Sequence, residues 1–514
     1  MSSWGLSQHV LANLIASGVR DFVLCPGSRN TPLSLTLVRC AREGLVNLHR
    51  RMDERAAGFL GLGVAKVTGA CALVVTSGSA VGNLLPAVME AHASGVCLIV
   101  ISADRPATLQ ASRSNQTTSQ SGIFGAHCVH TANLYSNDDS PAAWASQTRR
   151  AVVAGLGLRT CRPGPVQINL GLDTPLTPEE GPGLAALVAS ADFSLPASRD
   201  PHLEDLEYVP GTVVLAADAS ADVGAAAAQV AEKACLPLLA EPSSNARHSS
   251  NAIWNYVPQL ASGRIDEINR VLVYGHPTLS RSVAKLLSSA DQVIAVGQFA
   301  DWPDPGLTVT GVVDAVRVEP DKSDWLCSWQ SPEPQPEREL SGTSAVAQFL
   351  SHAGQNIFFG SSNSIRYADN CANWPKGTCY ANRGLAGIDG AIATAAGIAL
   401  ASGKPTSALM GDLTFLYDAG ALLIPAGQPQ PDLRVVVLDD DGGAIFRSLE
   451  VGAAEFADDF TQAFGMPHGH DLAEIARGYG VDAQKVATLD GLNSALSKPI
   501  DGLSVVVAAM PPVA

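Results

Sequence analysis

Short apolar runs separated by Ala- and Leu-rich stretches recur along this chain, and this alternation limits its fold more than any other feature. In the first third of the sequence the apolar runs span residues 21–25, 72–75, 97–101 and 166–169. Runs of this length are typical of strands that are buried on both faces. The alternation therefore predicts βαβ units, and with them an α/β fold of parallel sheets flanked by helices.

Stretches rich in Pro, Ser and acidic residues divide the chain into three parts. Residues 175–182 and 194–201 indicate a first surface linker, and residues 331–337 a second. Apolar runs recur between the linkers, at 212–216, 271–274 and 293–296, and after them, at 357–359 and 503–507. We expect three α/β domains, at 1–178, 200–330 and 345–514, which agrees with a typical domain size of about 150 residues. The first and third segments are alike in pattern.

The charge and the cysteines of the chain limit its partners and its compartment. A net charge of −16 argues against nucleic acid and against an anionic membrane surface as partners, so an anionic substrate must be met by local arginines. The ten cysteines are scattered singly and indicate reduced residues of a cytoplasmic protein. No apolar stretch approaches about 18 residues, and no targeting signal opens the sequence, so no membrane span is expected.

Two acidic segments near the C-terminus each follow a predicted strand. Gly411-Asp412-Leu413 follows the apolar run 406–410, and the segment Asp439-Asp440-Asp441-Gly442-Gly443 follows the run 434–438. In open α/β sheets ligands bind outside the carboxyl ends of strands, so these carboxylates should lie where a ligand binds. Mg²⁺ prefers carboxylate, carbonyl and phosphate oxygens. The pair therefore predicts a site for a divalent metal on a diphosphate.

Three further motifs have less specific signals on their own. Asp53 and Glu54 precede a helix of small residues, where either could act as a helix cap. Residues 76–80, Thr-Ser-Gly-Ser-Ala, follow a strand and could hold an anion. His468 and His470 flank a glycine after Pro467, and we expect them in a solvated loop without a metal.

Considered together, the motifs resemble those of the thiamine diphosphate-dependent enzymes. Within that superfamily the chain is similar to the 2-succinyl-5-enolpyruvyl-6-hydroxy-3-cyclohexene-1-carboxylate synthase (MenD) family. The segments with this resemblance are residues 25–33 (CPGSRNTPL), 53–55 (DER), 76–80 (TSGSA), 102–106 (SADRP), 115–117 (NQT), 382–390 (NRGLAGIDG) and 443–446 (GAIF). They are dense in the first and third domains and sparse in the middle one.

The resemblance implies a cofactor site shared by a pyrimidine-binding first domain and a diphosphate-binding third domain. Glu54 would hydrogen-bond the pyrimidine ring of thiamine diphosphate, and Ile388 would hold the cofactor in its bent form. Asp412, Asp440 and the backbone carbonyl of Gly442 would bind Mg²⁺ or Mn²⁺. The other implied cofactor contacts are Ser77, Gly78, Gly411, Leu413, Gly443 and Ile445.

The resemblance also implies the substrates, 2-oxoglutarate and isochorismate. Decarboxylation of 2-oxoglutarate would give a carbanion that adds in conjugate fashion to isochorismate, in menaquinone biosynthesis. Both substrates are dianions, which suits bidentate pairing with arginines. The implied catalytic residues are Glu54, Gln116, Ser362 and Arg383, and the implied substrate contacts are Ser28, Arg29, Arg105, Asn115, Arg281, Arg366 and Phe446. Of these, Arg281 comes from the poorly matching middle domain.

The second acidic segment departs from the family pattern, which has asparagines or a mixture of Asn and Asp there. Two like charges about 4 Å apart repel by roughly 1 kcal/mol in water-like surroundings and roughly 4 kcal/mol at an effective dielectric constant near 20. A bound Mg²⁺ offsets this repulsion, so we expect strongly metal-dependent cofactor binding. Asp439 lies 27 positions after Asp412 and Asp440 lies 28 after it. The following Gly-Gly-x-Ile-Phe favours Asp440 as the ligand.

Two alternatives remain open from the sequence. Another thiamine diphosphate-dependent 2-oxoacid decarboxylase or an acetolactate-type synthase would share Glu54 and the metal segment, without needing the arginine motifs. A catalytically silent member of the fold is suggested by the three consecutive aspartates, although the intact Glu54 argues against it. In the superfamily Glu54 and the metal segment of one site come from different subunits, which implies a homodimer or homotetramer.

Overall fold

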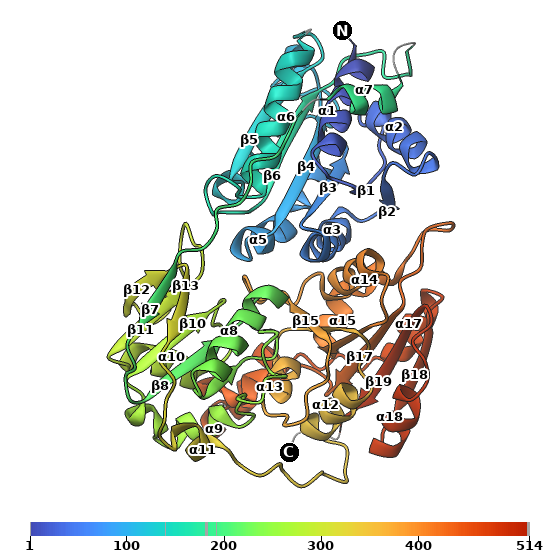
Figure 1. The fold of residues 1–514 in the computed structure, drawn as a ribbon. Helices are drawn as coiled ribbons and strands as arrows, with labels where there is room; N and C mark the ends of the chain where they lie inside the picture. The colour runs from blue at the N-terminus through green and yellow to red at the C-terminus, as the bar shows by residue number, and fades with distance from the viewer. Residues whose placement is uncertain (1, 139, 180–182, 192, 511–514) are drawn as a thin grey trace. The chain divides into compact units, whose positions relative to one another are not determined.

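The computed structural model describes residues 2–138, 140–179, 183–191 and 193–510. Their contacts group into two compact units. Unit 1 comprises the described residues up to Arg199 together with Asp389–Gly403 and Gly420–Pro431. Unit 2 comprises Asp200–Ile388, Lys404–Ala419 and the described residues from Asp432 onward. The α/β class is confirmed, because every sheet is parallel and flanked by helices (Figure 1).

Unit 1 is built on a six-stranded parallel sheet with the order β2-β1-β3-β4-β6-β5. Its strands are β1 (Asp21–Leu24), β2 (Asn47–Arg50), β3 (Ala70–Val75), β4 (Cys97–Asp104), β5 (His130–Tyr135) and β6 (Val166–Gly171). Its helices are α1 (Ser3–Ala16), α2 (Thr31–Arg42), α3 (Glu54–Thr68), α4 (Ser79–Gly82), α5 (Leu85–Ala93), α6 (Pro141–Gly155), α7 (Leu184–Ser190) and α14 (Ala391–Ser402), with short 3₁₀ turns at Ala107–Leu109 and Gly125–His127.

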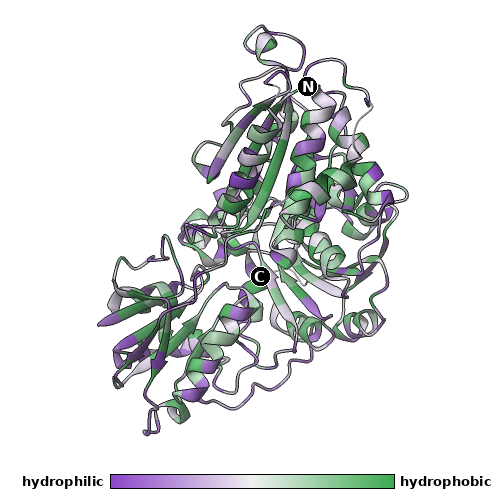
Figure 2. Cartoon of the chain, turned by 45° about the horizontal axis from the view of Figure 1, so that its top comes forward, coloured by the Kyte–Doolittle hydropathy of each residue, from purple (hydrophilic) through white to green (hydrophobic). Residues whose placement is uncertain are grey.

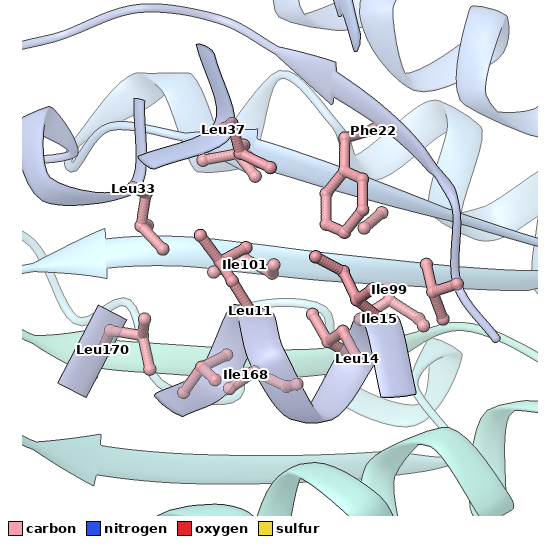
Figure 3. Packing of buried hydrophobic residues seen from close by; sticks show 14 of the residues in the cluster. Leu11, Leu14, Ile15, Phe22, Leu33, Leu37, Ile99, Ile101, Ile168 and Leu170 are labelled. Atoms are coloured by element: carbon pink, nitrogen blue, oxygen red, sulfur yellow. The ribbon is translucent and has the colours of Figure 1, made fainter. Parts of the chain in front are cut away.

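A core of aliphatic side chains holds the helices of unit 1 against its sheet. Leu11 and Ile15 of α1, Leu37 of α2, Ile99 of β4 and Ile168 of β6 all belong to this core (Figure 3). All five side chains are almost completely buried. Their burial removes apolar surface from water, the main favourable contribution to folding. Several strands of the sheets are accordingly coloured as hydrophobic along much of their length (Figure 2).

Helices α3 and α14 of unit 1 make the most extensive contact between any two elements of the described chain. Glycines allow this close approach. A Cβ added at Gly63 of α3 would lie 2.0 Å from the carbonyl oxygen of Thr394 of α14, and one added at Gly397 would lie 2.2 Å from that of Leu60. The two backbones are therefore in contact where the helices cross, which only glycine permits.

The first part of unit 2 contains a five-stranded parallel sheet with the order β12-β11-β10-β8-β9 and a pair, β13-β7. The strands are β7 (Leu203–Leu206), β8 (Thr212–Ala216), β9 (Leu238–Ala240), β10 (Arg270–Tyr274), β11 (Gln292–Val296), β12 (Val309–Val313) and β13 (Ala315–Val318). The helices are α8 (Ala221–Lys233), α9 (Tyr256–Ala261), α10 (Arg281–Ser289) and α11 (Trp325–Trp329), and Arg264–Glu267 forms a 3₁₀ turn.

The second sheet of unit 2 has six parallel strands in the order β15-β14-β16-β17-β19-β18. They are β14 (Asn356–Phe359), β15 (Thr378–Ala381), β16 (Thr406–Gly411), β17 (Leu433–Asp439), β18 (Asp482–Val486) and β19 (Leu503–Ala509). Around them lie α12 (Gly342–Ser351), α13 (Asn363–Asp369), α15 (Asp412–Asp418), α16 (Ala457–Phe460), α17 (Leu472–Gly478) and α18 (Leu489–Leu496). Between β17 and α17 the chain forms short 3₁₀ turns and one π turn, Thr461–Gly465.

The two six-stranded sheets have the same strand order, which confirms the likeness expected between the first and third segments. Numbered within its own sheet, each follows the order 2-1-3-4-6-5. The order reverses between the first and third strands, so each sheet has a topological switch point there, at β1/β3 and at β14/β16. Ligands of open α/β sheets bind at such points, outside the carboxyl ends of the strands.

The strand predictions are confirmed at every predicted run, and the residues predicted to form linkers lack regular structure wherever they are described. Residues 180–182 of the first linker lie outside the described residues. The boundaries of the three domains stay a prediction, since the contacts group the chain into two units. All ten cysteines are free, although Cys235 and Cys327 are exposed rather than in the core. Within the described residues, the helices are too short or too polar to cross a membrane.

Candidate active site

The switch point of the second sheet of unit 2 places two predicted segments next to each other. Strand β14 ends at Phe359 and is followed by the loop that holds Ser362, while the parallel neighbour β16 ends at Gly411 and is followed directly by Asp412. Ser362 has a φ of +79°, a conformation that is strained for a residue with a side chain. Backbone strain of this kind is frequent at functional sites.

A cavity of about 130 Å³ opens at this switch point. Its lining includes ten of the residues named from the sequence, drawn from four separate stretches of the chain. They are Ser362, Ile388, Gly411, Asp412, Leu413, Asp440, Gly442, Gly443, Ile445 and Phe446. The fold thus brings together the predicted contacts for the cofactor, the metal and the apolar wall that lie in unit 2, and their individual roles stay predictions.

The carboxylates beside this cavity are close together and partly desolvated. The Asp412 carboxylate accepts hydrogen bonds from the backbone N–H of Leu413 at 2.6 Å and of Gly442 at 2.7 Å. Burial, and then the charges of Asp412 and Asp439, raise the pKa of Asp440 to about 7. Adjacent carboxylates that resist ionisation together are suited to a divalent cation, which neutralises them and prefers oxygen ligands. The donor set therefore fits Mg²⁺ or Mn²⁺.

The prediction of a solvated loop is wrong for His468. Its side chain is only 8% exposed, and Nε2 lies 3.4 Å from one carboxylate oxygen of Asp412 and 3.4 Å from one of Asp439. These three groups form a possible cation cluster. However, Nδ1 accepts the backbone N–H of His470 at 3.0 Å, so a neutral ring bears its proton on Nε2 and faces the carboxylates as a donor. His470 itself is exposed, as expected.

A second cavity, of about 600 Å³, borders the same acidic segment and shares Asp440, Gly442 and Gly443 with the first. Asp439, His468 and Lys485 line it, and Lys485 Nζ lies 3.8 Å from the Asp439 carboxylate. Asp441 accepts backbone hydrogen bonds from His468 and Gly469. The three aspartates thus have different surroundings, since Asp440 lines both cavities and Asp439 contacts His468.

Three predicted arginines of unit 2 have different environments. Arg383 is 3% exposed and donates to Thr278 and to the hydroxyl of Ser361. Arg366 donates to the carbonyl of Ser362 at 2.7 Å, and burial together with the charge of Arg383 lowers its pKa. Arg281 is exposed and pairs with Glu450 at 3.4 Å on the surface. Among the described residues, therefore, Arg366 and Arg383 are close to each other, and Arg281 has a surface partner instead.

Another group of predicted residues gathers at the β1/β3 switch point of unit 1. Arg105 donates to the hydroxyl of Ser77 at 3.2 Å and to the carbonyl of Asn115 at 2.7 Å. Gln116 has a φ of +57° and donates to the carbonyl of Ser77. Burial, and then the charge of Arg105, lower the pKa of Arg29.

The Nε atom of Arg29 is buried without a hydrogen-bond partner in the described part of the chain. An unsatisfied guanidinium N–H beside a second arginine fits a carboxylate ligand, because each group would gain a charge-assisted bond. Gly78, with a φ of +86°, passes so close to Gln116 that a Cβ there would lie 2.9 Å from the Gln116 side chain. Ser28, by contrast, is exposed.

The structure at the start of helix α3 shows which of the two acidic residues, Asp53 or Glu54, caps the helix. Asp53 is the cap, since its carboxylate accepts the backbone N–H groups of Arg55 at 2.8 Å and Ala56 at 3.4 Å. Glu54 makes no capping bond and instead accepts a long hydrogen bond from Asn83 at 3.4 Å. The Glu54 carboxylate is therefore available for a ligand.

Comparison with known proteins identifies the family. Two family models match the chain: thiamine pyrophosphate enzyme, N-terminal TPP binding domain, over residues 5–124, and its C-terminal TPP binding domain over residues 362–508. A 2-succinyl-5-enolpyruvyl-6-hydroxy-3-cyclohexene-1-carboxylate synthase of Paenarthrobacter aurescens is 41% identical over 98% of this chain and 94% of its own length.

The chain belongs to the 2-succinyl-5-enolpyruvyl-6-hydroxy-3-cyclohexene-1-carboxylate synthase family. A second member of this synthase family, from Nocardioides sp., is 41% identical over 99% of the chain and 95% of its own length. Benzoylformate decarboxylase of Polynucleobacter necessarius shares the fold, with a TM-score of 0.73 over 99% of both chains at 16% identity. The resemblance seen in the sequence is thus confirmed for the synthase family and its fold.

Two residues of the site escaped sequence reasoning. His468 follows a proline in a loop, and nothing local to it shows that the loop folds back onto β16 and β17. Thr278 lies in the segment between β10 and α10, remote in sequence from the Arg383 that it contacts. The contact of Thr278 with Arg383 likewise arises only in the folded chain. In the sequence, Thr278 could be singled out only because it follows the carboxyl end of a strand.

Proposed function

We propose that this protein decarboxylates 2-oxoglutarate and adds the resulting carbanion to isochorismate, giving 2-succinyl-5-enolpyruvyl-6-hydroxy-3-cyclohexene-1-carboxylate for menaquinone biosynthesis. The main support is the match over nearly the whole chain to relatives that bear this synthase name. The grouping of ten motif residues around one cavity agrees with it. The protein would act in the cytoplasm as a homodimer or homotetramer.

Residues of both units would hold the cofactor. When bound, thiamine diphosphate supplies an electron sink for decarboxylation. Glu54 would accept or donate a proton at the pyrimidine ring, and Ile388 would support the bent form of the cofactor. Asp412, Asp440 and the Gly442 carbonyl would bind Mg²⁺ or Mn²⁺, a set that suits hard cations. The remaining contacts would come from Ser77, Gly78, Gly411, Leu413, Gly443 and Ile445.

The substrates would be oriented by guanidinium and amide groups. Arg29 and Arg105 in unit 1, and Arg366 and Arg383 in unit 2, would pair with the carboxylates of the two dianions. Phe446 and Ile445 would keep water from the reacting carbon, since a proton taken from water would waste the carbanion. The other proposed substrate or catalytic residues are Ser28, Asn115, Gln116, Arg281 and Ser362.

A single assay tests this function. The protein is incubated with thiamine diphosphate, Mg²⁺, 2-oxoglutarate and isochorismate, and the isochorismate absorbance is followed. We expect a loss of absorbance that requires 2-oxoglutarate and falls by roughly 10²- to 10⁴-fold in Glu54→Gln, the range for a lost acid–base group. Carbon dioxide release without loss of isochorismate would instead support a simple decarboxylase. No turnover and no cofactor binding would support a silent member of the fold.

A further inference from the structure

The guanidinium group of Arg383 is held mainly by a residue from a different sheet. Its Nε donates to the hydroxyl of Thr278 at 3.1 Å, and its Nη2 donates to the same hydroxyl and to the Thr278 carbonyl, both at 3.0 Å. A fourth bond runs from Nη1 to the hydroxyl of Ser361 at 3.3 Å. An arginine side chain has five N–H groups, so, counting partners among the described residues, one N–H of Nη1 is left for a ligand.

Thr278 is itself fixed by its neighbours in the middle part of the chain. The backbone N–H of Leu279 donates to the carboxyl group of Glu241 at 3.3 Å, and Glu241 is 1% exposed. On the other side, the N–H of His276 donates to the carbonyl of Asp218 at 2.9 Å. The loop after β10 is thus attached at two points to the ends of β8 and β9.

Electrostatics explain why Arg383 needs such a support. Arg366 lies near enough for the charge of Arg383 to lower its pKa. Two guanidinium groups this close repel each other, and each would relax away from the other if it were free. Four hydrogen bonds to neutral oxygens restrain Arg383 in its place.

We propose that Thr278 is a positioning residue for Arg383 and that the middle sheet thereby takes part in substrate recognition. This inference rests on the proposed function, because it assigns Arg383 to a substrate carboxylate. Thr278 touches no substrate in this scheme. It sets the direction of the one free Nη1 N–H, and a small displacement of a positioned group is costly in catalysis.

The test compares two substitutions of similar size at one position. Thr278→Val keeps the shape and the backbone carbonyl but removes the hydroxyl that accepts two bonds, whereas Thr278→Ser keeps that hydroxyl. Thr310→Val is the matched control, since within the described residues the Thr310 hydroxyl bonds to the backbone of Val293 and to no arginine. For each variant kcat and KM are measured for both substrates, and cofactor affinity is measured separately by quenching of tryptophan fluorescence.

We expect Thr278→Val to lower kcat/KM for one substrate by roughly ten- to a hundredfold, the factor for losing hydrogen bonds to a charged group. Cofactor affinity should not change, and Thr278→Ser should restore most of the loss. In an Arg383→Lys background, Thr278→Val should add little, because the two residues act as a unit.

Three results would overturn the inference: wild-type kinetics in Thr278→Val, equal losses in the Val and Ser variants, or losses that simply add to those of Arg383→Lys. If the wild-type protein shows no turnover, the proposed function fails first. The same double-mutant cycle, measured as unfolding free energies in urea, then decides whether Thr278 holds Arg383, and an absence of coupling there overturns the contact as well.

Discussion

At the scale of single residues, Asp440 is close to two other carboxylates, and this predicts an unusual response to substitution. Burial and the charges of Asp412 and Asp439 raise its pKa to about 7, so the ionised form is disfavoured until a cation binds. In Asp440→Asn the repulsion of the diphosphate is relieved, and cofactor binding should tighten by about fivefold or more, corresponding to roughly 1 kcal/mol.

The measurement is thiamine diphosphate affinity as a function of Mg²⁺ concentration, by fluorescence quenching or calorimetry. Asp441→Asn is the matched control, because Asp441 is exposed and bonds to the backbone of His468 and Gly469. It makes the same change of charge in the neighbouring position. Loss of cofactor binding in Asp440→Asn would contradict this prediction. It would show that the Asp440 carboxylate contributes more to binding as a metal ligand than it costs through repulsion of the diphosphate.

Glu241 gives a pH prediction that is independent of the metal. Burial, followed by the charge of Asp369, raises its pKa to about 8, although the positive charge of Arg383 acts in the opposite direction and lowers the pKa. The folded state therefore retains a proton that the unfolded chain releases near its ordinary pKa. Stability from this group is fully present at acidic pH and is lost as the pH rises towards 8, at about 1.4 kcal/mol for each tenfold difference in proton affinity between the folded and unfolded states.

Glu241→Gln keeps an oxygen for the Leu279 N–H and removes the titration. At pH 9 we expect the variant to unfold at a higher urea concentration than the wild type, with a free energy of unfolding that is larger by several kcal/mol at most. Below pH 5 the two proteins should differ little. Urea unfolding at several pH values checks this. A difference between the two proteins that stays constant from pH 5 to pH 9 would contradict the raised pKa.

At the scale of elements, the sequence predicts the centre of each sheet better than its edges. Strands such as β4 and β17 are buried along their whole length, so they read as continuous apolar runs. The edge strands β2, β5 and β18 mix exposed residues with partly or fully buried ones, for example His-Thr-Ala-Asn-Leu-Tyr in β5, and none of them was expected. An edge strand is half solvated, so its composition resembles that of a loop.

The candidate site follows the same logic. Asp412 and Asp440 could be found because each closes a central strand, and the position of a strand end in an open sheet is fixed by topology. His468 could not be found, since its burial depends on how a loop of some 30 residues between β17 and α17 returns to the sheet. Thr278 likewise depends on tertiary contact, and no local pattern reports such contacts.

The crossing of α3 and α14 predicts a strong effect of one methyl group. In Gly63→Ala the new Cβ would meet the backbone carbonyl of Thr394, which cannot rotate away as a side chain can. We expect a loss of about 1–3 kcal/mol of stability or more. Gly82→Ala in α4 is the control, because nothing lies within 4 Å of a Cβ there, and it should be neutral or slightly stabilising. Thermal unfolding of both variants separates the outcomes, and equal melting temperatures would refute the close approach.

At the scale of the whole molecule, two sheets of identical strand order each have, at a switch point, side chains that we propose to bind ligands. Unit 1 supplies Glu54 and the pair Arg29 and Arg105, and unit 2 supplies the acidic segment and the cavity. Neither set is a complete site by the chemistry proposed above, because the pyrimidine contact and the diphosphate contact come from different units. The proposed function therefore requires both sets of side chains, from one chain or from two.

The superfamily pattern predicts that they meet between two chains, and complementation of inactive subunits tests this. Glu54→Gln disables the pyrimidine contact and Asp412→Asn the metal contact, so each homodimer should be inactive. In a heterodimer, purified through two different affinity tags, one of the two sites combines the intact Glu54 of one chain with the intact Asp412 of the other. Since a twofold dimer has two equivalent sites, the heterodimer should show about half of the wild-type activity per dimer. If each site is instead formed within one chain, neither site of the heterodimer is intact and no activity is recovered. A dimer of two Glu54→Gln chains with different tags is the control for subunit exchange and contamination.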